Sequence, residues 1–173
     1  MLTRRDVTIT IQTVRRGIPV PLFATEMSDG EEDLEEEIPE EIDEAMYDGE
    51  DEAEEAEMMM EGRLVATSQR VELSYDESEL TGMEGSTTKI VFDCAHPGLI
   101  SLLRSGSVST ALVFEEKKRH VCVYSTPFSS FEVCVHTLRV ENELLTLGKL
   151  TLDYLIEIHG ARTEHCKMIL TVR

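Results

Sequence analysis

The sequence lacks the features that mark membrane-spanning or exported proteins. No run of apolar residues approaches the roughly 18 that a helix needs to cross a bilayer. Basic residues occur at Arg4 and Arg5, but no apolar stretch follows them, so we expect no secretory signal. The cysteines form no CxxC pair, and we expect reduced thiols in a cytoplasmic protein. They are Cys94, Cys122, Cys134 and Cys166.

Motifs that carry well-known chemistry are also missing. There is no serine on a strand–turn–helix elbow, no glycine-rich phosphate loop and no HExxH pair. No long segment repeats its apolar residues with the 3.6-residue period of a helix. We therefore favour a non-enzymatic protein, and a metal- or thiol-dependent enzyme is the less favoured alternative.

One stretch lacks positive charge altogether. Residues 26–57 contain 19 of the 35 acidic residues and no Lys, Arg or His, which leaves 16 acidic and 16 basic residues elsewhere. A segment so charged and so poor in apolar residues cannot offset its chain entropy by burial. We predict one domain with its body at 1–21 and 58–173, and a disordered acidic insertion at 22–57.

This charge distribution also limits the partners. A neutral body with an acidic insertion disfavours binding to nucleic acid, because phosphate contacts need a basic surface. Residues 26–57 could engage a basic protein, which gives an interaction module as the alternative function. A tolerated expansion of a surface loop is the simpler interpretation, since each doubling of loop length costs only about 0.6 kcal/mol.

What the sequence does contain is a persistent period of two. In residues 5–14, Val7, Ile9 and Ile11 alternate with Thr8 and Thr10, which is typical of a half-buried strand. Similar segments separated by turn residues predict an all-β fold of about eight to ten antiparallel strands, closed into a barrel that removes its exposed edges. The other segments are 58–66, 69–76, 87–93, 99–103, 108–114, 119–125, 131–140, 150–159 and 165–173.

Several motifs along these segments resemble a known family. They are Glu61–Leu64, Ser74–Thr88, Arg104–Val108, Val113–Glu116, His120, Tyr124–Phe128 and Leu152–Ile158. Together they resemble the YwiB-like domain of unknown function, which is found in bacteria and widely in Firmicutes. The resemblance covers residues 1–16 and 58–173 and implies an intracellular calycin-like (lipocalin-like) barrel with no assigned activity. The acidic insertion and the four cysteines depart from the family pattern.

Four polar residues within the strands are candidates for binding a ligand. Arg104, His120, Tyr124 and Tyr154 would orient a small apolar or amphipathic molecule if they faced the inside of a barrel. If they faced outward they would belong to an ordinary solvated sheet surface. Alternation places Tyr154 with Leu152 and Ile156 on the apolar side, in the core or in a pocket.

The connection Glu77–Gly85 has two interpretations. Its carboxylates and glycines could form an oxygen-rich metal loop or a lid at the mouth of the barrel, but it lacks the acidic 1-3-5 spacing of a calcium loop. We favour a structural connection in which Gly82 and Gly85 adopt positive φ angles.

A histidine–cysteine set offers the one cofactor hypothesis, zinc. If the hairpin of 119–125 and 131–140 is centred on Phe128, then Cys122 faces Cys134 and His120 faces His136. All four side chains would then share one face at distances that Zn²⁺ could bridge, or the two thiols could form a disulfide. A slip of one residue would divide the set between two faces, which leaves ordinary thiols and surface histidines.

Overall fold

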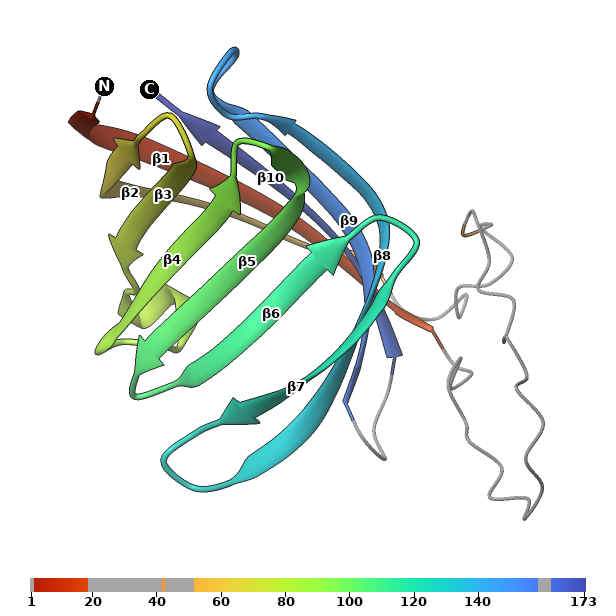
Figure 1. Ribbon diagram of the computed structural model, residues 1–173. Helices are drawn as coiled ribbons and strands as arrows, with labels where there is room; N and C mark the ends of the chain where they lie inside the picture. The colour runs from red at the N-terminus through yellow and green to blue at the C-terminus, as the bar shows by residue number, and fades with distance from the viewer. Residues whose placement is uncertain (1, 19–41, 43–51, 159–162) are drawn as a thin grey trace.

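The described residues form one closed sheet of ten antiparallel strands. The computed structural model describes residues 2–18, 42, 52–158 and 163–173. Each strand pairs with its sequence neighbours, and β1 closes the barrel by pairing with β10 (Figure 1). The strands are β1 (Thr3–Ile18), β2 (Glu54–Ala66), β3 (Arg70–Asp76), β4 (Ser86–Asp93), β5 (His96–Gly106), β6 (Ser109–Glu115), β7 (Arg119–Ser125), β8 (Ser130–Glu143), β9 (Lys149–Ile158) and β10 (Thr163–Val172). The predicted all-β barrel is confirmed.

Alternation along the strands determines which side chains fill the barrel. In β1, Val7, Ile9 and Ile11 are buried, and the residues between them are more exposed. Because neighbouring strands pair in register, the inward positions form continuous rows around the barrel. The period of two seen in the sequence therefore corresponds to the inside and outside of the wall.

The apolar core fills the end of the barrel that holds both chain termini (Figure 1). Leu144, in the connection between β8 and β9, is only 1% exposed and belongs to this core. The fully buried side chains of this core include Ile9, Leu73, Ile90, Ile100, Phe114, Leu150, Leu152 and Leu170.

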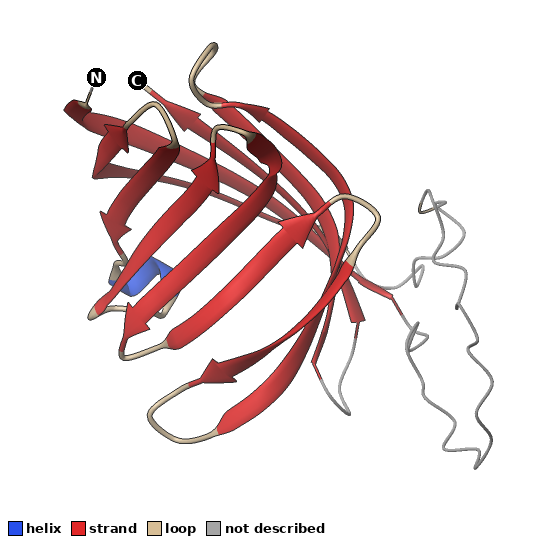
Figure 2. Ribbon diagram, in the orientation of Figure 1, coloured by secondary structure: helices blue, strands red, loops and turns tan. Residues whose placement is uncertain are grey.

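At the opposite end of the barrel, the connections that the structure describes follow β3, β5 and β7. The β3–β4 connection contains a single turn of 3₁₀ helix, η2 (Glu79–Thr81), which lies at the same end as the β7–β8 turn (Figure 2). Gly82 and Gly85 in this connection have φ angles of 69° and 82°, as predicted. Both angles lie in the left-handed region that glycine adopts without strain.

The predicted boundary of the acidic insertion is wrong at its C-terminal end. Residues 54–57, assigned to the insertion, form the first residues of β2 and pair with residues 12–15 of β1. Glu55 and Glu57 share one face of this strand, where the Gln12 side chain donates a hydrogen bond to the Glu57 carboxylate. The rest of the predicted disordered segment, apart from residues 42, 52 and 53, lies outside the described residues.

Candidate functional site

At the end of the barrel opposite the chain termini, the inward-facing residues are no longer all apolar and include charged and aromatic side chains. There the barrel contains a cavity of about 480 Å³. Its wall combines aliphatic side chains and methionines with five charged and four aromatic residues. The lining includes Ile11, Arg15, Met58, Met60, Tyr75, Glu77, Leu102, Arg104, Leu112, Tyr124, Phe131, Val133, Tyr154, Ile156, Cys166 and Met168.

A buried ion pair is the strongest polar feature of the cavity. The Arg104 guanidinium in β5 lies 3.1 Å from the Glu77 carboxylate, and their side chains are 11% and 2% exposed. Arg104 Nε also donates to the Thr88 hydroxyl at 3.0 Å, and Thr88 donates to Glu77. The buried charges of Arg104 and Glu77 are therefore paired with each other and hydrogen-bonded through Thr88, as buried charges need to be.

Tyr75 extends this network toward the cavity. Its hydroxyl hydrogen-bonds with Thr88 and Arg104, and burial, followed by the nearby Glu77 carboxylate, raises its pKa. The phenol therefore stays protonated at physiological pH.

Tyr154 and Cys166 form a second, neutral polar group on the neighbouring strands β9 and β10. The Tyr154 ring contacts Phe114 edge-to-face at 4.9 Å, and its hydroxyl hydrogen-bonds with the Cys166 sulfur. Burial raises the pKa of Cys166 to about 12, with the Glu164 carboxylate as the next cause, and burial also raises the pKa of Tyr154. Both groups are neutral at physiological pH, so the thiol is poorly suited to act as a nucleophile.

The third polar element connects the β7–β8 hairpin to the β3–β4 connection at the hollow end of the barrel. Tyr124 in β7 stacks on Phe131 in β8 at 5.4 Å, and its hydroxyl lies 3.5 Å from the Met83 sulfur. Met83 belongs to the β3–β4 connection, and Leu80 and Met83 of that connection line the cavity. This connection therefore covers part of the cavity, as the lid alternative requires.

Three of the four predicted ligand residues come together at this cavity. Arg104, Tyr124 and Tyr154 line it, from strands far apart in the sequence. His120 is on the inward side of β7, opposite Val135, but its Nε2 lies 3.5 Å from a Glu115 carboxylate oxygen and it is not part of the lining.

Sequence reasoning missed three of the most informative residues of this site. Glu77 continues the inward phase of Leu73 and Tyr75, a signal that was present in the sequence. Met58 and Met60 also face inward. The predicted strand starts at Met58, so the inward phase that Ala56 shares with them was not recognised.

The predicted register of the β7–β8 hairpin is wrong by one residue. The structure pairs Cys122 with Val133 and His120 with Val135, whereas Val121 faces Cys134. Thr126 N–H donates to the Ser129 carbonyl at 2.8 Å, and this closes a four-residue turn. The hairpin is therefore centred between residues 127 and 128 rather than on Phe128.

This slip divides the histidine–cysteine set between the two faces of the hairpin. His120 and Cys122 face inward, whereas Cys134 and His136 face outward, so neither the zinc cluster nor a Cys122–Cys134 disulfide forms. Burial, and then the neighbouring Arg119, lowers the pKa of His136. In the part of the chain that the structure describes, no group of three or more His, Cys, Asp or Glu could hold a metal ion.

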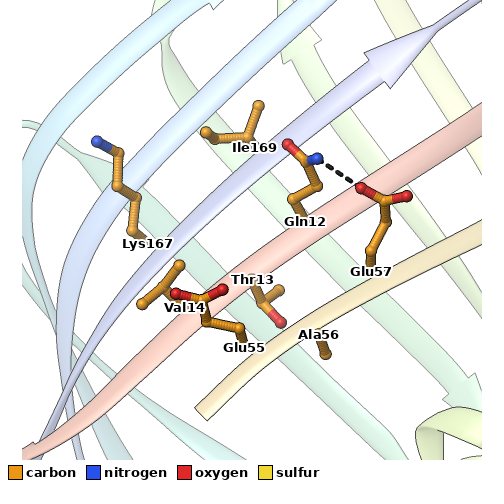
Figure 3. Close-up of a pocket in the computed structure, with 8 residues that line it drawn as sticks. All are labelled: Gln12, Thr13, Val14, Glu55, Ala56, Glu57, Lys167 and Ile169. Carbon is orange, nitrogen blue, oxygen red and sulfur yellow. Dashed lines mark hydrogen bonds between the residues drawn. The ribbon is translucent and has the colours of Figure 1, made fainter. Parts of the chain in front are cut away.

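A second hollow of about 450 Å³ lies where β1, β2 and β10 meet (Figure 3). Lys167 and the carboxylates of Glu55 and Glu57 line it, and Glu57 accepts the hydrogen bond from Gln12. It lacks the enclosing apolar wall of the first cavity.

Among the described residues, no helix is both long and apolar enough to span a membrane.

The fold and the cavity define a class: closed, ten-stranded antiparallel β-barrels that are packed at one end and hollow at the other. The chain belongs to the family described as "Domain of unknown function (DUF1934)", whose model matches residues 41–170. A search of curated proteins found no match.

A solved structure supports the same fold. The chain is similar to the structure described as "Crystal structure of ywiB protein from Bacillus subtilis", with a TM-score of 0.61 and 16% sequence identity. The alignment covers 97% of this chain and 92% of that chain. At this identity the similarity shows the fold, and it agrees with the YwiB-like resemblance of the sequence motifs.

Proposed function

We propose that the protein is a non-enzymatic barrel that binds a small amphipathic molecule in the cavity at its open end. The observation that carries this proposal is the composition of the cavity wall. Aliphatic and methionine side chains are half of its lining residues, and the Arg104–Glu77 pair and three tyrosines supply fixed polar contacts. Small-molecule sites combine apolar walls with a few placed polar groups in this way.

The methionines support binding of an apolar portion of such a ligand. Met58, Met60, Met83 and Met168 all line the cavity, and their unbranched, polarisable side chains adapt to ligands of different shape. A volume of about 480 Å³ lies within the range of about 300–1,000 Å³ typical of ligand sites.

Two finer features belong to the same proposal. We place the protein in the bacterial cytoplasm, and the four free thiols of the described residues support this location. We also relate the barrel to the calycins, which its sequential antiparallel strand order supports.

Consecutive methionines in β2 allow a matched test of cavity binding. Met60 lines the cavity, whereas Met59 is 73% exposed on the outer face. We expect Met60→Trp to fill the cavity and to weaken binding of the amphipathic dye 1-anilinonaphthalene-8-sulfonate by at least about tenfold, or 1.4 kcal/mol. Met59→Trp adds the same ring outside and should leave dye binding unchanged.

Fluorescence titration of the dye measures both affinities, and cooperative thermal unfolding of each variant shows that the fold is kept. Equal dye affinity for the Met60→Trp and Met59→Trp variants would contradict binding in the cavity.

A further inference from the structure

The cavity at the hollow end contains an arginine that no carboxylate compensates. Arg104 is paired with Glu77, but Arg15 forms no ion pair with any residue that the structure describes. Arg15 follows Ile11 and Thr13 at the inward positions of β1, and all three residues line the cavity. A guanidinium stays protonated at every physiological pH, so this position presents an unpaired positive charge to a ligand.

The strand register places Arg15 in one inward row with two polar side chains of the cavity. Arg15 pairs with Cys166 of β10, and Cys166 pairs with Tyr154 of β9. Burial is the main cause that raises the pKa of Cys166 and Tyr154, and the Arg15 charge acts on both in the opposite direction. The field of Arg15 therefore reaches the inside of the cavity, although Arg15 itself is exposed.

The carboxylates closest to Arg15 in the register do not pair with it. Glu54 of β2 is opposite Arg15, and Glu164 of β10 is opposite the next inward residue, Gly17. Glu54 is exposed, and an exposed pair stabilises little. Three basic and two acidic residues line the cavity, which leaves a net charge of +1. They are Arg15, Arg104, Lys167, Glu77 and Glu164.

The apolar part of the lining lies deeper in the barrel than Arg15. Ile11, Leu102, Leu112 and Met168 line the cavity and also belong to the hydrophobic core, so they form the apolar floor of the cavity. At about 3.3 Å per residue, Ile11 lies about 13 Å from Arg15 along β1. The cavity therefore has a cationic mouth and an apolar floor, separated by about the length of a decyl chain.

We propose that the ligand of this cavity is an amphipathic anion, whose head group binds Arg15 at the mouth and whose alkyl chain lies against the apolar floor. This inference rests on the proposed function and adds the charge and the orientation of the ligand. A singly charged head such as a carboxylate compensates the net charge of the lining, and a guanidinium can donate two parallel hydrogen bonds to it. A cationic head would leave Arg15 unpaired and place a second positive charge beside it.

Displacement of Nile red, an uncharged apolar dye, measures the binding of decanoate, decanol and decylammonium, which differ mainly in the charge of the head group. We expect the protein to bind decanoate at least about tenfold more tightly than decylammonium. Arg15→Gln should weaken decanoate binding at least about tenfold and leave decanol binding unchanged, because only the anion pairs with the guanidinium.

Arg16→Gln is the matched control for this substitution. Arg16 is the next residue of β1, lies on its outer face and is not part of the cavity lining. Its substitution removes the same charge from the protein and should leave decanoate binding unchanged. Arg15→Glu should reverse the preference, so that decylammonium binds more tightly than decanoate. Thermal unfolding of each variant shows that the fold is kept.

The outcomes separate this inference from the proposed function. If Nile red binds and Met60→Trp excludes it, equal decanoate affinities of Arg15→Gln and Arg16→Gln would overturn the role of Arg15 alone. Decylammonium binding as tightly as decanoate to the unchanged protein would overturn the assignment of an anionic ligand. If Nile red does not bind, or binds Met60→Trp and Met59→Trp equally, the proposed function is wrong and so is this inference.

Discussion

At the scale of single residues, the cavity depends on charges that compensate each other away from water. Arg104 and Glu77 are held by Thr88 and Tyr75, and none of these groups would be stable in the wall alone. Buried pairs of this kind stabilise little overall, but removing one partner leaves a charge without compensation.

This property can be measured with a double-mutant cycle. We expect Glu77→Leu to lower the free energy of unfolding by about 3 kcal/mol, because the Arg104 guanidinium would remain buried and unpaired. Arg104→Met should cost a similar amount, and the double variant should lose less than the two single losses together. Urea denaturation gives the three values, and strictly additive losses would show that the pair is not coupled.

The sequence identified part of this residue-level arrangement. Alternation placed Tyr154 on the apolar side, where the structure finds it. Arg104 and Tyr124 were candidates because they are polar residues within strands. Only the pairing of their strands with the neighbouring strands shows that they face inward. Glu77 was assigned to a connection, and only the packed barrel shows that it points back to Arg104.

At the scale of elements, the sequence predicts most of the strands. Their ends and their register depend on the turns and on close packing between strands. The strand ends differ most from the expected ones in β1, β2, β5 and β8, which are all longer than predicted. The hairpin register depended on one turn: a loop of four residues instead of a centre on Phe128 moved two of the four proposed zinc ligands to the other face. Hydrophobic pattern alone does not fix this choice, because both faces of the hairpin contain apolar residues.

Close packing of two strands supplies a second prediction. A Cβ atom at Gly62 in β2 would lie 2.3 Å from Ile9 Cδ1 and 2.7 Å from the Ser74 carbonyl oxygen. We expect Gly62→Ala to lower the free energy of unfolding by about 1–3 kcal/mol, because the Ser74 backbone cannot move freely. Gly98→Ala is the matched control, since nothing lies within 4 Å of its Cβ position, and it should change stability by less than about 0.5 kcal/mol.

Thermal or urea unfolding of both variants provides the comparison. Equal stability of Gly62→Ala and Gly98→Ala would show that the Ile9 side chain and the Ser74 backbone shift to accommodate the added methyl group.

At the scale of the whole molecule, most of the net charge lies in one stretch of the sequence. The acidic residues of 26–51 carry 15 negative charges with no compensating base, and removing them changes the formal net charge from −19 to −4. Deletion should stop before residue 52, because β2 begins at Glu54. The acidic composition suggests a deletion of residues 26–57, but the start of β2 limits the deletion to residues 26–51.

The interaction alternative predicts a clear effect of this deletion. If residues 26–51 recruit a basic partner, a chain lacking them should lose capture of that partner in a pull-down from cell extract while far-ultraviolet dichroism stays that of a β protein. Unchanged capture would reject the acidic segment as the binding element, and a loss of β structure would show that the barrel needs it.

The alternation of apolar and polar side chains along each segment determined by itself that this chain folds into strands of a sheet, because a period of two suits only a sheet with unlike faces. Tertiary structure alone decided which end is hollow and which polar groups meet there. Those properties depend on register and on contacts between residues far apart in the chain, and local patterns do not encode them.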